Sequence, residues 1–253
     1  MKAKVYGING SVTEEISLPA DFEEEFRPDI IRKAVNIMRS NRRQPYGVEA
    51  TAGKKHPVEP WSSGRGVSRV PRLTQGRRAA FMPGTVGGRT AHPPRPERDW
   101  SRKINKKEME LAKKSALATV AVEEMVRKRG HVFDEGVSLP VVVEDDFEKI
   151  DKTKKAIEAM RSIGVYADIE RAQNGKHIRA GKGKMRGRKY KTPKSLLIVV
   201  KDKEKIKKAA GNLTGVDIIT PEEMNVEYLA PGGDAGRLTI FTVNAIKSME
   251  EKA

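Results

Sequence analysis

Apolar side chains recur at helical spacing in two long stretches of the sequence. Within residues 28–39, Ile30, Ala34 and Ile37 fall on one stripe, and in residues 105–130 apolar residues return every three or four positions. This period of about 3.6 residues is typical of an amphipathic helix. The sequence therefore predicts a helix that ends at Arg39 and a second one, the longest of the chain, that ends at Gly130.

Other apolar stretches have the pattern of β-strands. Residues 139–144 and 195–200 are continuous runs rich in β-branched side chains, typical of parallel strands that are buried on both faces. Residues 165–170 alternate between apolar and polar positions, which predicts another strand. Shorter extended stretches are predicted at residues 3–8, 216–220 and 237–241.

Helices are predicted between these strands. Asp145 or Asp146 is expected to cap a helix that Gly164 ends, and residues 203–210 form a short helix. Residues 220–223 read Thr-Pro-Glu-Glu, a capping box that starts another helix, and residues 243–251 form a terminal one. Strands that alternate with helices predict an α/β fold: a single three-layer domain whose mostly parallel sheet is covered by helices on both faces.

The central stretch, residues 44–100, has no such pattern. It contains eight of the 14 prolines, eight of the 22 glycines and both tryptophans. A structureless insertion of this length is uncommon in a compact domain unless it is functional or disordered. We therefore expect residues 1–43 and 101–253 to form the globular domain, and residues 44–100 to be a long, extended basic arm inserted into it.

Composition and charge narrow the class of protein. The 253 residues include 50 Lys and Arg against 34 Asp and Glu, a net charge of +16, and only 37% are hydrophobic. Such an excess indicates a polyanionic partner, with nucleic acid first and an anionic membrane surface second.

The chain has no cysteine, which excludes disulfides and thiolate metal sites and favours the cytoplasm. No stretch resembles a signal peptide or approaches the roughly 20 apolar residues of a membrane span, so we expect a soluble protein.

Catalytic patterns are weak. The glycines of residues 175–187 miss the spacing of phosphate-binding and dinucleotide-binding loops, and those of residues 232–236 suit a tight turn. The four histidines have no metal-ligand spacing and are expected at the surface or on RNA: His56, His92, His131 and His177. Asp145 and Asp146 follow a strand, a common place for catalytic groups, but helix capping explains them. The sequence predicts neither an enzyme nor a cofactor or metal site.

The basic segments predict RNA binding. Residues 41–100 carry twelve Lys or Arg against four acids, and ten of the twelve are arginine, whose planar guanidinium binds phosphate and stacks on bases. A flexible basic linker is the alternative reading, although linkers seldom contain two tryptophans. Residues 176–191 contain no acid among their lysines and arginines and have no helical period, which excludes an amphipathic membrane helix. Trp61 either stacks on a base or packs against protein, and Tyr190 either stacks or anchors its loop to the core.

Several short motifs match a known family. They are NRRQPYG (41–47), WSSGRG (61–66), GRTAHPP (88–94), the DW.RKIN run of residues 99–105, RGRKY (186–190) and LAPGGDAGRLTIF (229–241). Together they span nearly the whole chain, which resembles large-subunit ribosomal protein four, the universal L-four family, in its archaeal and eukaryotic form. The long C-terminal extension typical of eukaryotic members is absent, so the resemblance is to an archaeal member.

The resemblance implies a non-enzymatic constituent of the large ribosomal subunit in the cytoplasm. Its globular domain would lie on the subunit surface, and its arm would thread through ribosomal RNA to the nascent-peptide exit tunnel. Residues 63–78 would lie near the tunnel constriction, beside large-subunit ribosomal protein twenty-two and the passing nascent peptide. Arg42 and Arg43 would grip RNA at the root of the arm, and Arg89, His92 and Arg95 would do so on its returning limb.

The predicted site residues form two sets. The RNA-binding set is Arg42, Arg43, Lys54, Lys55, Trp61, Arg65, Arg69, Arg72, Arg77, Arg78, Arg89, His92, Arg95, Arg98, Lys182, Lys184, Arg186, Arg188, Lys189 and Tyr190. The set at the tunnel-facing tip is Ser63, Gly64, Arg65, Gly66, Val67 and Arg69. Two other functions stay open: an α/β enzyme acting on nucleic acid through Asp145 and Asp146, and a regulator that binds its own messenger RNA.

Overall fold

The structure is a computed structural model that describes residues 1–251. The chain divides into two compact units, one made of residues 1–39 with 102–251 and the other of residues 40–101. The first unit contains the mixed sheet and nearly all buried apolar side chains. The second contains a small antiparallel hairpin, β3 (Val58–Pro60) with β4 (Pro71–Leu73).

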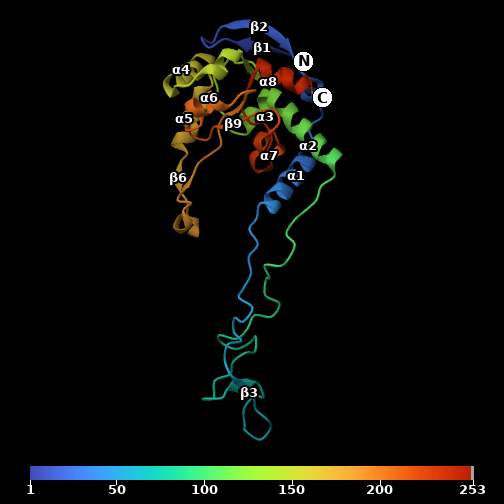
Figure 1. The fold of residues 1–253 in the computed structure, drawn as a ribbon, viewed down its shortest axis with the longest axis vertical. Helices are drawn as coiled ribbons and strands as arrows, with labels where there is room; N and C mark the ends of the chain where they lie inside the picture. The colour runs from blue at the N-terminus through green and yellow to red at the C-terminus, as the bar shows by residue number, and fades with distance from the viewer. Residues whose placement is uncertain (252–253) are drawn as a thin grey trace. The chain divides into compact units, whose positions relative to one another are not determined.

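A six-stranded sheet forms the centre of the first unit (Figure 1). Its strands lie in the order β2, β1, β5, β10, β8, β9, with β2 antiparallel to β1 and every other neighbouring pair parallel. In chain order the strands are β1 (Lys2–Tyr6), β2 (Val12–Ser17), β5 (Val141–Val143), β8 (Leu197–Val199), β9 (Asp217–Ile219) and β10 (Thr239–Thr242).

Both faces of this sheet are buried. Leu197 and Val199 point into one apolar cluster, and their neighbour Ile198 points into the other, as the pleat of a strand requires. The first cluster takes side chains from α1 (Pro28–Asn41), α2 (Lys106–Ala118), α7 (Val226–Leu229) and α8 (Val243–Glu250). The second takes them from α3 (Glu123–Lys128), α4 (Thr153–Ile163), α5 (Tyr166–Asn174) and α6 (Glu204–Ala210). The predicted three-layer α/β fold is confirmed.

The strand predicted at residues 165–170 is wrong, because this segment begins helix α5. Gly164 ends α4 in the left-handed conformation, with φ of +87°, and the chain enters α5 at Tyr166. Val165, Ile169 and Ala172 are all buried, at spacings of four and three. Six residues of alternation are too few to separate this helical stripe from a strand.

The longest predicted helix is also wrong, because it is two helices. α2 ends at Ala118, a 3-10 turn follows, and Val122 adopts an extended conformation before α3 begins. The hydroxyl of Thr119 donates to the carbonyl of Ala116 at 2.7 Å, a side-chain bond that competes with continuation of the helix. The longest helix is instead α1, with 14 residues.

The predicted caps are partly wrong. Residues 145–149 form a 3-10 turn, and α4 starts only at Thr153. Asp145 does cap a helix, but a remote one: its Oδ1 accepts from the backbone N–H of Asn244 in the first turn of α8 at 2.8 Å. The segment 220–223 is a turn, and the next helix, α7, begins after Asn225, whose side chain accepts from two backbone amides. Strand β2 was not predicted.

A fully buried arginine ties the ends of several elements together. Arg237 precedes β10, and its Nε donates to the carbonyl of Ser195 at 2.8 Å while its Nη1 donates to that of Tyr228 at 3.0 Å. Its Nη2 lies 2.7 Å from a carboxylate oxygen of Asp217 and also bonds the carbonyls of Leu196 and Gly215. Burial lowers the pKa of Arg237, and Asp217 opposes this effect. The guanidinium therefore binds acceptors from the residues just before β8, from β9 and from α7.

We expect Arg237→Met to destabilise the first unit by about 3–5 kcal/mol, because the carbonyls of Ser195 and Tyr228 would lose the guanidinium and Asp217 would keep only Lys194 as its side-chain partner. Urea unfolding followed by circular dichroism measures the loss. Arg32→Met is the matched control, because Arg32 forms only an exposed ion pair with Asp234 at 3.5 Å. A loss for Arg237→Met no larger than that of the control would show that the buried network does not hold the fold.

Candidate nucleic-acid interface

The unit of residues 40–101 has almost no core of its own. Among residues 41–100, all of which the structure describes, Ala80 is the single buried side chain. An outgoing limb leads to the β3–β4 hairpin and a returning limb leads away from it (Figure 1). The two limbs are joined by a hydrogen bond from the N–H of Val48 to the carbonyl of Pro94, at 3.1 Å. Contacts other than apolar burial must therefore hold this unit in place.

Trp61 lies between two arginines at the β3–β4 hairpin. The guanidinium carbon of Arg65 lies 4.7 Å from the centre of the Trp61 ring, and that of Arg72 lies 5.1 Å from it. Arg72 also donates to the carbonyls of Arg77 and Ser68, at 2.6 and 3.3 Å. Trp61 thus packs on protein in this structure, and Arg72 holds the hairpin backbone.

A second aromatic cluster joins the two ends of the unit. The rings of Tyr46 and Trp100 are stacked, with centroids 6.1 Å apart and planes 18° from parallel. The guanidinium groups of Arg43 and Arg98 lie 4.8 and 5.0 Å from the centre of the Trp100 ring. An arginine that stacks by its face keeps its N–H edge free for phosphate. Tyr46 and Trp100 were missed from the predicted site set, although each lies within three residues of an arginine in the sequence.

The predicted RNA-binding side chains are mainly exposed. Of the twenty, only Trp61, Arg72 and Arg89 are half-buried. All six residues of the predicted tip, 63–67 and 69, are exposed, and Gly64 and Gly66 have left-handed φ angles of +90° and +67°. The structure thus places a row of cations where a polyanion can reach them, while the contacts themselves stay a prediction.

The second basic segment forms a small hairpin on the first unit. β6 (His177–Ile178) pairs with β7 (Tyr190–Lys191), and a 3-10 turn lies between them. The amino groups of Lys176 and Lys189 lie 4.8 and 5.6 Å from the centre of the Tyr190 ring. Tyr190 is 50% exposed, so it does not anchor the hairpin in the core.

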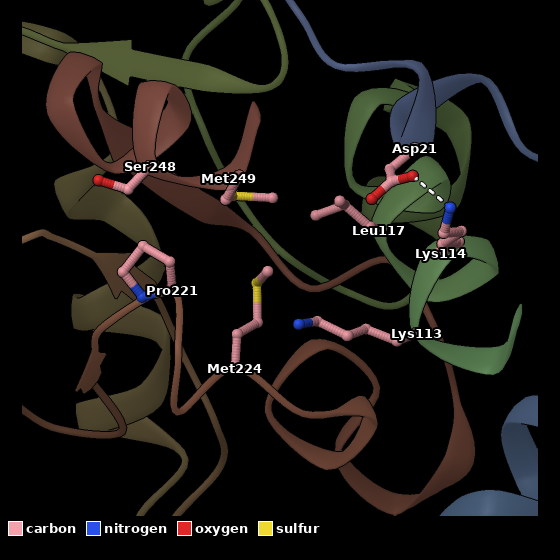
Figure 2. A pocket seen from close by; sticks show the side chains of 8 residues that line it. All are labelled: Asp21, Lys113, Lys114, Leu117, Pro221, Met224, Ser248 and Met249. Atoms are coloured by element: carbon pink, nitrogen blue, oxygen red, sulfur yellow. Dashed lines mark ion pairs between the residues drawn. The ribbon is translucent and has the colours of Figure 1, made fainter. Parts of the chain in front are cut away.

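The sites suggested for an enzyme have ordinary structural roles. Asp146 pairs with Lys149 at 2.7 Å, and Asp145 caps α8. A pocket of about 100 Å³ is lined by Asp21, Lys114, Met224 and Met249 among others, and the carboxylate of Asp21 pairs with Lys114 at 2.8 Å. Figure 2 shows this pair and the other lining side chains. Within residues 1–251 there is no group of three or more potential metal-ligating side chains. No helix in that range is long and apolar enough to cross a bilayer.

His131 departs from the expected surface location of the histidines. It is buried, and its Nδ1 lies 2.9 Å from Oδ2 of Asp168, whose other oxygen, Oδ1, accepts from Nε of Arg171. Burial lowers the pKa of His131, an effect partly opposed by Asp168 and strengthened by Arg129 and Arg171. Burial alone would raise the pKa of Asp168, but its hydrogen bonds to His131 and Arg171 hold it below the ordinary value. The other three histidines are exposed.

Comparisons with known proteins find one family over nearly the whole chain. The model of the ribosomal protein L4/L1 family matches residues 16–252. A protein of Archaeoglobus fulgidus called large ribosomal subunit protein uL4 is 54% identical over 251 residues, 99% of each chain. A protein of the same name from Methanopyrus kandleri is 46% identical over 100% of this chain and 99% of its own length. Another, from Thermoplasma acidophilum, is 48% identical over 99% of this chain and 98% of its own length.

The buried histidine predicts how stability depends on pH. Because the pKa of His131 is lower in the folded chain than in the unfolded one, the unfolded chain binds the extra proton first as the pH falls. We expect the free energy of unfolding to decrease below about pH 6.5, by at most about 1.4 kcal/mol per pH unit for one proton. Urea unfolding at pH 7, 6 and 5 measures this slope.

His131→Gln should reduce the slope, and His177→Gln, at an exposed position, should not. Equal slopes in the wild-type chain and in His131→Gln would contradict the account.

Proposed function

Because the chain belongs to the ribosomal protein L4/L1 family, we propose that it is a non-enzymatic structural constituent of the large ribosomal subunit in the cytoplasm. In this proposal it binds large-subunit ribosomal RNA and supports assembly of the subunit. Residues 44–100 act as an arm, and the remaining chain is the domain that carries it. The family and the full-length similarity to proteins named for the large subunit support this function.

The observation that carries the RNA-binding part is the contrast between charge and burial in residues 41–100. Twelve cationic side chains accompany one buried side chain. Ordering a residue costs roughly 1–2 kcal/mol of conformational entropy, and this segment buries too little apolar surface to offset that cost. Binding to a polyanion supplies the missing free energy, as in segments that fold on binding.

The proposed mechanism is neutralisation of phosphates by arginines already held by the protein. The guanidinium carbons of Arg43, Arg65 and Arg98 lie 4.8, 4.7 and 5.0 Å from the centres of tryptophan rings, and in this proposal their N–H groups bind phosphate oxygens. The hairpin of residues 176–191 adds a second basic contact from the globular unit. Such contacts read mainly the shape of folded RNA, and their strength falls as salt rises.

The tip of the arm lines the nascent-peptide exit tunnel in this proposal, beside large-subunit ribosomal protein twenty-two. The resemblance of residues 61–66 to the family motif supports it. So does the chemistry of the tip, where Ser63, Gly64, Gly66 and Val67 are small or apolar and exposed among the arginines. A passing peptide would meet little that could bind it.

Incorporation into the large subunit tests this function. We expect the variant Arg65→Ala, Arg69→Ala, Arg72→Ala to keep the circular dichroism of the globular unit and to enter large subunits about tenfold less well than wild type, since loss of roughly 1.4 kcal/mol is tenfold. Sedimentation of tagged protein with subunits measures incorporation. The matched control removes three exposed lysines, Lys154, Lys155 and Lys205. Normal incorporation of the arginine variant, or an equal loss in the control, would contradict an RNA-anchored arm.

Tryptophan fluorescence offers a second test without a label. Both tryptophans lie in residues 40–101, so their emission reports on the arm and not on the globular domain. We expect fragments of large-subunit RNA to change the emission at Trp61 and at Trp100, because RNA would alter the solvent around both rings. The variants Trp61→Phe and Trp100→Phe separate the two signals. An unrelated RNA duplex is the control, and an equal change with it would contradict specific docking of the arm.

A further inference from the structure

Two glycines hold the limbs of the arm against each other. A Cβ atom on Gly47 would lie 2.4 Å from Cδ of Pro96, and one on Gly53 would lie 2.5 Å from the backbone nitrogen of Arg89. Gly53 also has a φ of +73°, a conformation that L side chains rarely adopt. At both positions the limbs approach more closely than any larger residue allows. The outgoing and returning limbs are therefore joined at two points.

An open cavity lies between the limbs beside these contacts. It has a volume of about 650 Å³ and is lined by residues 48–50, 52, 54 and 89–97, from both limbs. We call it the limb cavity. Its volume lies in the range of roughly 300–1,000 Å³ that small-molecule sites occupy, and it is far larger than a single metal or phosphate ion needs. Both sides of this cavity belong to the unit of residues 40–101, so the unit supplies the whole site.

The lining is charged and mostly cationic. Its ionisable residues are Glu49, Lys54, Arg89, His92, Arg95 and Glu97. Lys55 binds the carboxylate of Glu49 at 2.6 Å, and this bond, with one from Thr51, lowers the pKa of Glu49. The lining therefore carries Lys54, Arg89 and Arg95 against Glu97 and Glu49, and Lys55 already compensates the charge of Glu49. Such a lining suits a ligand that carries a phosphate and also hydrogen-bond donors for Glu97.

The returning limb supplies flat surfaces as well as charge. Pro93, Pro94 and Pro96 line the cavity, and proline offers a ring face and a carbonyl but no N–H. His92 stands before them with a φ of +46°, a left-handed conformation that is strained for a residue with a side chain. Such strain persists where the surrounding structure requires it and is concentrated at functional sites. The imidazole and the proline rings can contact the faces of a planar base.

We propose that the limb cavity receives one unstacked nucleotide of the large-subunit ribosomal RNA. Its phosphate would bind Lys54, Arg89 and Arg95, and its base would lie against His92 and the prolines. The inference rests on the proposed RNA-binding function. It deepens that function because phosphate contacts alone cannot select one nucleotide, whereas contacts with a base can. Recognition of single-stranded nucleotides whose bases are turned out of the helix is the usual way in which proteins read RNA sequence.

Filling the cavity tests this inference. Ala52 and Ala91 line it, so Ala52→Leu with Ala91→Leu narrows the space without changing charge. The matched control is Thr153→Leu with Asn212→Leu, at exposed positions of the first unit that lie outside the cavity and outside both basic segments. The full chain is bound to large-subunit ribosomal RNA, affinity is measured by filter binding, and each nucleotide is probed with base-modifying and ribose-acylating reagents.

We expect the wild type and the control to protect the base of one unpaired nucleotide that the filled variant leaves reactive. The filled variant should bind about tenfold more weakly, on the order of one lost base contact. Identical reactivities for all three proteins would overturn the limb cavity as a nucleotide site, as would weaker binding with no change at a single nucleotide. Either result leaves the proposed function standing. If wild type binds this RNA no better than an unrelated RNA, the proposed function fails instead.

Discussion

The uneven placement of apolar side chains along the chain is the constraint on which the structure depends. The sheet of the first unit is buried on both faces, and Leu197, Ile198 and Val199 alternate between two clusters. Residues 41–100 contribute one buried side chain. One part of the chain can therefore fold by burying its own surface, whereas the other has cations, stacked rings and close backbone contacts in place of a core. The proposed function gives that second part the polyanion that its charge requires.

Arginine has three different physical roles in this chain. Arg237 is fully buried and binds acceptors before β8, in β9 and in α7. Arg72 is half-buried, stacks on Trp61 and binds carbonyls of its own hairpin. Arg69 is exposed. These three arginines contribute equally to the net charge of the chain. Burial, which the sequence composition does not give, decides which of them RNA can reach.

The limits of the sequence prediction have physical causes. The apolar runs at 139–144 and 195–200 predicted strands correctly, because six residues rich in β-branched side chains are too short for a buried helix, although the strands themselves cover only 141–143 and 197–199. The strand prediction for residues 165–170 failed because six residues fit a helix as well as a strand. The helix break at Val122 was missed because the apolar spacing continues through the 3-10 turn of residues 119–121. The exposure of the cations in the arm could be predicted from the excess of arginine and the lack of an apolar pattern in residues 41–100. Their contacts with RNA stay a prediction. The limb cavity could not be predicted, since it needs the pairing of Gly47 with Pro96 across 49 residues.

The most direct measurement is filter binding of the full chain, and of a variant lacking residues 48–97, to fragments of large-subunit ribosomal RNA over a salt series. Each neutralised phosphate contributes about 0.7–0.9 to the slope of log affinity against log salt. The account predicts a steep slope for the full chain and a clearly flatter one for the variant, whose circular dichroism stays that of an α/β domain. Equal affinities and equal slopes would contradict it, because RNA binding would then belong to the globular domain and its 176–191 hairpin.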